Sequence, residues 1–134
     1  PIITQKKIDG VGYDYKALVF FDKVYVLKRN VRKNDFRSSG SGDFEFVEVE
    51  PNILNFADKF RRKLKTPYVS MDIMKDTFGV LHCIEFQAVH FGPYTQINAP
   101  HYYMSVGGEW EIIRDEKKSL ESDIVYAVDR FIHE

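Results

Sequence analysis

The sequence predicts an α+β domain in which two or more helices pack on a mostly antiparallel sheet. Short stretches rich in aromatic and β-branched residues follow one another and are separated by turn-forming residues, which is typical of antiparallel strands. Two longer stretches place apolar residues at helical spacing instead. The total is five to seven strands and two helices, which defines the α+β class.

Length and composition indicate one globular domain, residues 1–134. The chain is 44% hydrophobic and contains 11 Phe, 8 Tyr and 1 Trp, enough to build a real core. Its formal net charge of −1 provides no overall field that would attract nucleic acid or a membrane surface. We find no secretory signal and no apolar run of about 18 residues, so we expect neither export nor membrane insertion.

The single cysteine, Cys83, excludes an intrachain disulfide and fits a reducing, cytoplasmic compartment. It lies in an apolar stretch, where we expect it to pack in the core rather than to act as a nucleophile. The sequence begins with Pro1 and continues into the apolar Ile2 and Ile3. We therefore expect the chain to be a fragment of a longer protein.

The first half of the chain predicts a strand pair, a long basic loop, a third strand and a helix. The expected ranges are strands at 13–21 and 24–29, a turn at 22–23, a loop at 30–42, a strand at 44–49 and a helix at 51–65. Pro51 suits the first turn of a helix. The cations Arg61, Arg62, Lys63 and Lys65 crowd the other end, where the helix dipole favours them.

The stretch from Ser70 to Gln87 predicts a hairpin that carries two carboxylates on one face. If the turn lies at Phe78-Gly79, antiparallel register places Asp72 directly opposite Glu85, with Gln87 diagonal to both. Two carboxylates about 5 Å apart repel each other unless a cation lies between them. Oxygen ligands favour a hard cation such as Mg²⁺. The alternative is a set of solvated polar side chains on the exposed face of a hairpin.

The histidines do not predict a metal site. In the same register His82 lies on the opposite strand face from Glu85, so we expect it to be packed in the core. The other three, His90, His101 and His133, show no ligand spacing to one another or to Cys83, which argues against zinc.

The last third of the chain predicts an irregular segment, a hairpin and a helix. Residues 88–100 contain two prolines and no clear period. Gly107-Gly108 is a two-residue hairpin signal between strands at 102–106 and 109–113. Ser119 is expected to cap a final amphipathic helix, whose buried face consists of Leu120, Ile124, Ala127, Val128 and Phe131.

The basic loop adds a candidate phosphate site. Arg29, Arg32, Lys33 and Arg37 lie close to the small residues 38–42. Guanidinium groups bind phosphate oxygens in a bidentate manner, and small residues let backbone N–H groups approach an anion. A merely solvated loop, or a small nucleic-acid-binding surface, is the alternative. Together with the carboxylates, the loop indicates nucleotide chemistry in which metal and arginine share a polyphosphate.

The order of these features resembles the C-terminal part of an ATP-grasp domain, over about residues 2–93. The matching segments are Gln5-Lys-Lys-Ile8, Tyr13-Asp-Tyr-Lys16, Arg29, Asp35-Phe-Arg-Ser-Ser-Gly-Ser-Gly42, Met71-Asp-Ile73 and Ile84-Glu-Phe-Gln87. The nearer branch contains glutathione synthetase and the ligases that add glutamate to a ribosomal protein. Residues 94–134 would then be a family-specific tail.

The resemblance implies a role for each matched residue. Gln5 and Lys6 would contact adenine, and Asp14 would belong to the nucleotide site. Arg29 and Arg37 would be the catalytic cations near the phosphates and the acyl group. Further nucleotide contacts would come from Arg37 with Ser38 and Ser39, and the metal ligands would be Asp72, Glu85 and Gln87.

The implied function is that of the ATP- and Mg²⁺-binding lobe (Mn²⁺ being the other candidate metal) of an ATP-dependent carboxylate–amine or carboxylate–thiol ligase. Such an enzyme forms an acyl phosphate and needs a carboxylate substrate. Gln87 and Ser39 stand where the family usually has asparagine, which motivates the alternative of a non-catalytic binding or assembly module. A substrate-binding domain and a lid lobe are missing from these 134 residues, so we expect the chain alone to be inactive and its exposed apolar surface to favour self-association.

Overall fold

The computed structural model describes residues 10–30, 44–89, 92, 94–114 and 119–134. Within these residues it contains seven strands and three helices, which confirms the α+β class. The elements are β1 (Gly10–Phe20), β2 (Lys23–Asn30), β3 (Phe44–Glu45), α1 (Pro51–Leu64), β4 (Tyr68–Asp76), β5 (Leu81–Gln87), α2 (Tyr94–Asn98), β6 (His101–Val106), β7 (Glu109–Arg114) and α3 (Leu120–Ile132).

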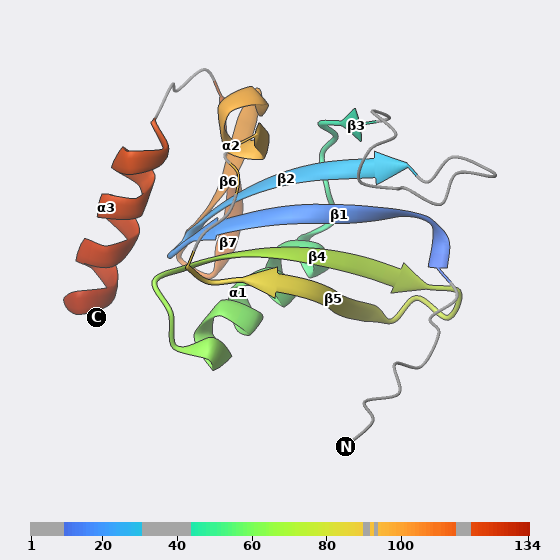
Figure 1. The fold of residues 1–134 in the computed structure, drawn as a ribbon, viewed down its shortest axis with the longest axis horizontal. Helices are drawn as coiled ribbons and strands as arrows, with labels where there is room; N and C mark the ends of the chain where they lie inside the picture. Colours follow the sequence, from blue (N-terminus) through green and yellow to red (C-terminus); the bar gives the residue numbers. More distant parts are fainter. Residues whose placement is uncertain (1–9, 31–43, 90–91, 93, 115–118) are drawn as a thin grey trace.

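All seven strands belong to one antiparallel sheet; six follow the order β5-β4-β1-β2-β6-β7, and β3 pairs with β2 off this path (Figure 1). The short β3 pairs with the end of β2 that β6 leaves uncovered, at Lys28 and Arg29, whereas β6 pairs at Lys23 and Val24. The tail strands β6 and β7 therefore extend the same sheet as the first part of the chain. No helix in the described part of the chain has the length and apolar character needed to cross a membrane.

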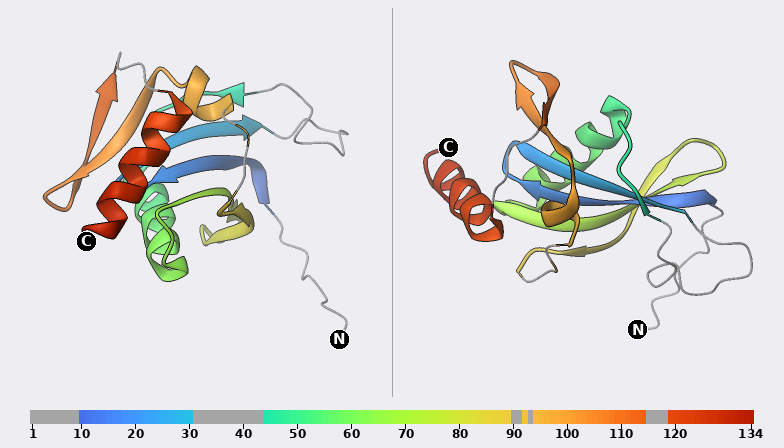
Figure 2. Two further views of the ribbon diagram at one scale, coloured as in Figure 1. Left: turned by 60° about the vertical axis from the view of Figure 1, so that its left-hand side comes forward. Right: turned by 90° about the horizontal axis from the view of Figure 1, so that it is seen from above.

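One face of the sheet is covered by α1, which lies behind the sheet in Figure 1 and on its upper side in the right-hand view of Figure 2. Strand alternation brings apolar residues of β1, β2 and β4 to this face, and α1 adds a matching apolar stripe. The buried members of this core are Ala17, Val19, Val24, Val26, Ile53, Leu54, Ala57, Val69, Met71, Ile73 and Tyr103.

The opposite face carries α2 and α3, but only at one end (Figure 2). Ser119 caps α3 by accepting a hydrogen bond from the backbone N–H of Ser122, as predicted. The helix packs Ala127 against Leu18, Phe20 and Tyr25. The rest of this face, over β5, β4, β1 and the end of β2, is covered by none of the helices that the structure describes.

A buried carboxylate, Asp123 on α3, ties the tail to the sheet. It is fully buried, and its Oδ2 accepts hydrogen bonds from Tyr25 Oη at 2.7 Å and from Gln96 Nε2 at 2.9 Å. Lys23 Nζ lies 3.9 Å from its other oxygen, and also 3.9 Å from the centre of the Tyr126 ring. The apolar period of α3 did not predict this contact, because it marks only hydrophobic positions.

Three local predictions were wrong. The first turn lies at Phe21-Asp22, one residue earlier than expected, because Lys23 already pairs with Phe20 in the ladder. Phe21 adopts a left-handed φ of 57° there. Close to this turn, Arg61 at the C-terminal end of α1 is buried: it is 2% exposed, donates to the Thr66 carbonyl at 3.0 Å and lies over the Phe21 ring.

The other two wrong predictions are the length of the third strand and the irregular segment before β6. The strand expected at 44–49 ends at Glu45. Beyond it, backbone groups form hydrogen bonds with Tyr103 Oη instead of with a neighbouring strand. That hydroxyl accepts from the Val49 N–H at 3.0 Å and donates to the Val47 carbonyl at 3.2 Å. The segment expected to be irregular contains the short helix α2, whose Thr95 and Gln96 are buried.

Replacing Asp123 by Ala should lower the free energy of unfolding by about 3–5 kcal/mol, because Lys23 would lose its buried counter-charge and two donors their acceptor. Urea denaturation measures this change. The matched control is Asp129→Ala on the same helix, where the carboxylate is exposed and the expected change is within about 0.5 kcal/mol. Equal losses in the two variants would contradict the role assigned to Asp123.

Candidate functional site

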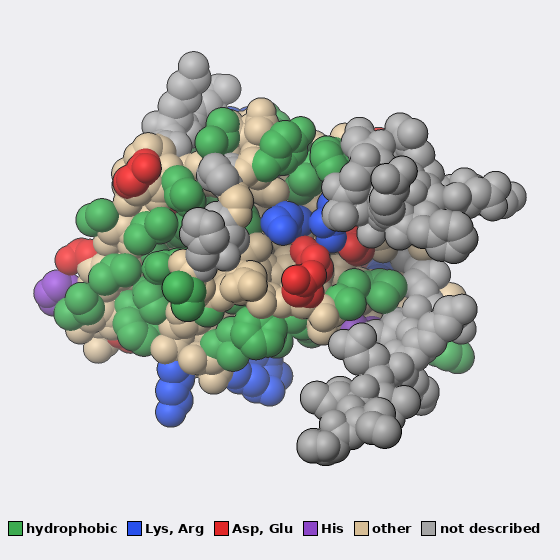
Figure 3. All heavy atoms as spheres, viewed as in Figure 1, with side chains coloured by type: hydrophobic (Ala, Val, Ile, Leu, Met, Phe, Trp, Pro, Cys, Tyr) green, Lys and Arg blue, Asp and Glu red, His purple; other side chains and the backbone are tan. Residues whose placement is uncertain are grey.

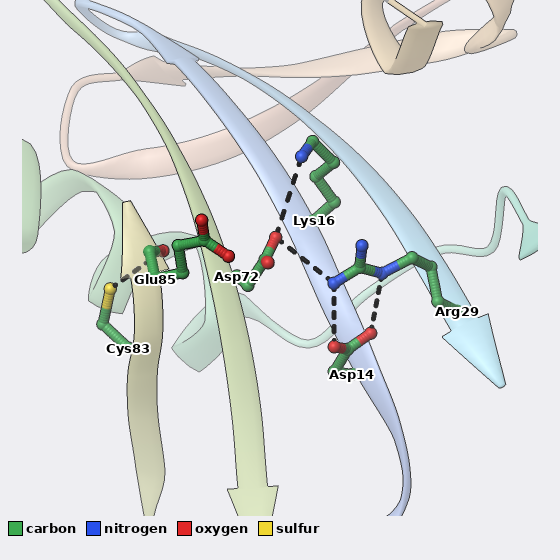
Figure 4. Close-up of polar contacts among 6 residues, drawn as sticks. All are labelled: Asp14, Lys16, Arg29, Asp72, Cys83 and Glu85. Atoms are coloured by element: carbon green, nitrogen blue, oxygen red, sulfur yellow. Dashed lines mark hydrogen bonds and ion pairs between the residues drawn. The ribbon is translucent and has the colours of Figure 1, made fainter. Parts of the chain in front are cut away.

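The part of this face that α2 and α3 leave free carries a row of polar side chains from four strands. Across-strand partners share a face, so the register places the predicted residues directly. Glu85 pairs with Asp72, and Asp72 pairs with Lys16. One step along the strands, Asp14 pairs with Arg29. These five residues lie on the face opposite α1, and Figure 4 shows them converging over β1 and β4.

The expected pairing of Asp72 with Glu85 is confirmed, but the path to it differs from the prediction. The turn closes with Asp76 N–H donating to the Val80 carbonyl at 2.9 Å, and Asp76 Oδ1 accepts from the backbone N–H groups of Phe78 and Val80. From this turn to the Ile73–Cys83 pair, the pairing of β4 with β5 is shifted by one residue from the predicted register. A β-bulge at Ile84 restores it before Glu85.

This bulge overturns the prediction for His82. His82 pairs with Met74 and therefore shares the face of Asp72 and Glu85. It is half-buried and lies in no core cluster. Its Nε2 is 2.9 Å from Asp76 Oδ2, and this hydrogen bond lowers the pKa of Asp76. Cys83, on the α1 face, packs against the core as predicted, and burial followed by the charge of Asp72 raises its pKa to about 11.

Arg29 is the centre of the polar cluster. Its Nε and Nη2 donate to the two carboxylate oxygens of Asp14 at 2.9 and 2.8 Å. The same Nη2 lies 3.2 Å from Asp72 Oδ1, so the side chain reaches from β2 across β1 to β4. Burial by itself lowers the pKa of Arg29, but the hydrogen bonds and charges of Asp14 and Asp72 outweigh it, and the pKa is raised overall.

Lys16 is a site residue that the sequence analysis did not select. Its Nζ lies 3.9 Å from Asp72 Oδ1, and its side chain is 31% exposed. The alternation of β1 could have identified it, because Lys16 lies two residues after Asp14 and so faces the same way. With three carboxylates and two cations, the cluster has one net negative charge.

The predicted metal ligands open onto one shallow pocket of about 170 Å³. Asp72, Glu85 and Gln87 all line it, together with Lys16, Ser70, Met71, Phe86 and Gly92. Gln87 pairs with Ser70, next to the Asp72–Glu85 pair. Three oxygen-bearing side chains on one pocket therefore fit a hard divalent cation.

Asp72 would have to share that cation with its present partners. Among the residues that the structure describes, no three His, Cys, Asp or Glu side chains form a metal-binding group, so Gln87 would have to supply the third oxygen. Metal binding at Asp72 would also weaken its pairing with Lys16 and Arg29, leaving both cations available to an anion.

The other predicted nucleotide contacts lie outside the described residues. These are Gln5 and Lys6 in the entry segment and Arg37, Ser38 and Ser39 in the basic loop. Their roles remain predictions.

Comparison with solved structures supports the class of fold. The chain is similar to a RiPP-associated ATP-grasp ligase from Chryseobacterium gregarium, solved in complex with ADP and a leader and core peptide. The TM-score is 0.57 at 18% sequence identity, covering 70% of this chain and 30% of the ligase. A second match, the ATP-grasp ligase PsnB complexed with a minimal precursor, has a TM-score of 0.48 at 19% identity, covering 74% of this chain and 32% of PsnB.

The first of these matches shows an ATP-grasp-like fold, as the sequence resemblance implied. No protein-family model and no curated protein sequence matches the chain. The chain spans about a third of the length of the two ligases.

Replacing Arg29 by Ala should lower the free energy of unfolding by about 3–5 kcal/mol, because the buried Asp14 would lose both of its hydrogen bonds and its counter-charge. Thermal or urea unfolding measures the loss. Arg114→Ala is the matched control: Arg114 pairs with Glu48 at 2.8 Å on the surface, and it should cost less than about 1 kcal/mol. A small effect at Arg29 would show that its ion pairs do not stabilise the fold.

Proposed function

We propose that this chain is the C-terminal, ATP- and Mg²⁺-binding lobe of an ATP-dependent carboxylate ligase. One observation carries the proposal: Asp72, Glu85 and Gln87 line a single pocket, beside Lys16 and Arg29, on an ATP-grasp-like sheet. Oxygen ligands next to cations suit a metal–polyphosphate complex, because the metal and the cations share the phosphate charge.

Each residue has a distinct part in this proposal. Asp72, Glu85 and Gln87 would hold Mg²⁺ or Mn²⁺, which supplies charge neutralisation at the phosphates. Lys16 and Arg29 would bind phosphate or acyl oxygens, and Asp14 would orient the Arg29 guanidinium through its paired hydrogen bonds. Gln5 and Lys6 would contact adenine, and Arg37, Ser38 and Ser39 would add nucleotide contacts from the loop.

The reaction that we propose is the one that the resemblance to ATP-grasp ligases implies. A substrate carboxylate attacks the γ-phosphorus of ATP and forms an acyl phosphate and ADP. An amine or thiol then attacks the acyl carbon and releases phosphate. The chain corresponds to 30% of the ligase with ADP, and we propose that the substrate-binding domain and the lid lobe lie in other parts of the full-length protein. The isolated chain would then be inactive.

Asp72→Asn and Glu85→Gln in the full-length protein should each reduce Mg²⁺-dependent ATP turnover at least about a hundredfold, because each removes a charged metal ligand. ADP release is the measurement. Glu111→Gln, on an exposed position of β7, is the control and should leave the rate unchanged. Retained turnover in the Asp72 and Glu85 variants would refute the proposed site.

One observation favours a non-catalytic binding module as the second candidate. Asp72 already lies 3.2 Å from Arg29 and 3.9 Å from Lys16, so the face is nearly neutral without any ligand.

Titration calorimetry of the full-length protein with Mg²⁺-ATP separates the two candidates. The ligase predicts a binding heat that depends on Mg²⁺ and is lost in Asp72→Asn. The module predicts no heat in either protein.

A further inference from the structure

An apolar surface lies beside the polar cluster, on the same face of the sheet. It consists of Phe44, Tyr94 and Ile97, and we call it the apolar wall. Phe44 of β3 pairs with Arg29 and therefore shares its face. The Phe44 ring packs against Tyr94 of α2, with ring centroids 5.7 Å apart. Figure 3 shows this face: hydrophobic side chains lie between α2 and β3, next to the Lys and Arg side chains at the middle of the molecule.

The wall is held firmly although its outer surface is exposed. Helix α2 contacts β1 and β2, the strands that carry Lys16 and Arg29. The α2 residues Thr95 and Gln96 are buried, and Gln96 donates a hydrogen bond to Asp123 of α3 at 2.9 Å. The outward residues remain open: Tyr94 is 53% exposed and Ile97 is 65% exposed.

The wall lies near the pocket of the candidate site, because Phe44 pairs with Arg29. Gly92, two residues before Tyr94, lines that pocket together with Lys16 and Asp72. A molecule that binds the cations of the site and extends toward β3 would therefore meet the Phe44–Tyr94 pair. Anchored aromatic rings of this kind bind apolar groups without a large loss of side-chain entropy.

The charges of the site indicate which chemical group the molecule would carry at the end opposite its apolar group. A divalent cation at Asp72, Glu85 and Gln87 would turn the net charge of the cluster from −1 to +1, counting Asp14, Asp72 and Glu85 against Lys16 and Arg29. Lys16, whose side chain is 31% exposed, would then be free to pair with an incoming anion. A carboxylate fits this end and an apolar group fits the wall.

We infer that the acid substrate of this protein carries an apolar, preferably aromatic, group, and that Phe44, Tyr94 and Ile97 select it. This inference rests on the proposed ligase function, because it takes the substrate to be a carboxylic acid bound beside Mg²⁺-nucleotide. It assigns a specificity role to α2, an element of the tail that holds none of the predicted nucleotide or metal ligands.

The test compares 3-phenylpropionate with propionate, two acids that differ only in the phenyl ring. Their binding to the full-length protein is measured by ligand-observed NMR with Mg²⁺ and a non-hydrolysable ATP analogue present. We expect 3-phenylpropionate to bind at least tenfold more tightly. Tyr94→Ala should reduce this ratio below threefold, whereas Tyr94→Phe should keep it, because the ring and not the hydroxyl forms the wall.

Two controls identify the cause of any change. Val125→Ala removes an exposed apolar side chain from α3, and it should leave the ratio intact. Affinity for the nucleotide analogue should be the same in all variants, which shows that Tyr94→Ala is folded. Equal affinities for the two acids, no binding of either acid, or an unchanged ratio in Tyr94→Ala would overturn the inference.

A second measurement separates this inference from the proposed function. With ATP and hydroxylamine, an acyl phosphate is trapped as a hydroxamate, because hydroxylamine attacks the acyl carbon and phosphate leaves. Preferential binding of 3-phenylpropionate without any hydroxamate would overturn the ligase reaction and leave the wall in place. Hydroxamate formed equally from both acids would overturn the wall and support the ligase.

Discussion

The polar cluster on the sheet face opposite α1 depends on the guanidinium of Arg29. Asp14 and Asp72 stand on the neighbouring strands β1 and β4, and both carboxylates point to the same side. Arg29 reaches over β1 from β2 and contacts both of them. Without this cation, like charges would face each other in a partly buried environment, where repulsion is screened less than in water. The arrangement therefore holds Asp72, one of the proposed metal ligands, in place.

A second buried charge, Asp123, gives the tail its place in the same architecture. It joins β2, α2 and α3 through one carboxylate, and burial with the hydrogen bond to Asp123 raises the pKa of Tyr25. The position of α2 beside the polar cluster therefore depends on a residue of the last helix. Sequence segments that lie more than twenty residues apart determine one wall of the candidate site.

Much of this could be predicted from the sequence. The strand alternation and the turn residues indicated the α+β sheet, both long helices and the hairpin at Gly107-Gly108. The pairing of Asp72 with Glu85 was also predicted, but through a turn that the protein does not adopt. The actual turn shifts the register of β5 by one residue, and the bulge at Ile84, which was not predicted, shifts it back. Glu85 lies beyond the bulge and keeps its predicted face, whereas His82 lies before the bulge and does not.

What the sequence could not predict depends on tertiary contacts. The burial of Arg61 and Asp123 requires partners that only the fold brings together, since periodicity marks apolar positions alone. Helix α2 has five residues, which is too short for a 3.6-residue period to be visible. Lys16 belongs to the site because β4 places Asp72 opposite it. The resemblance of the ordered motifs predicted the ATP-grasp-like fold, which a structural comparison at 18% identity confirms.

The bulge at Ile84 has a consequence for sequence change in this hairpin. In a regular ladder, each inserted or deleted turn residue would exchange the two sides of β5, and Glu85 would move from the pocket to the α1 core. A bulge absorbs one residue, so it can offset a single one-residue change in the register set by the turn. A turn that shifts the register by one residue would therefore leave Glu85 on the pocket side if the bulge at Ile84 were lost with it.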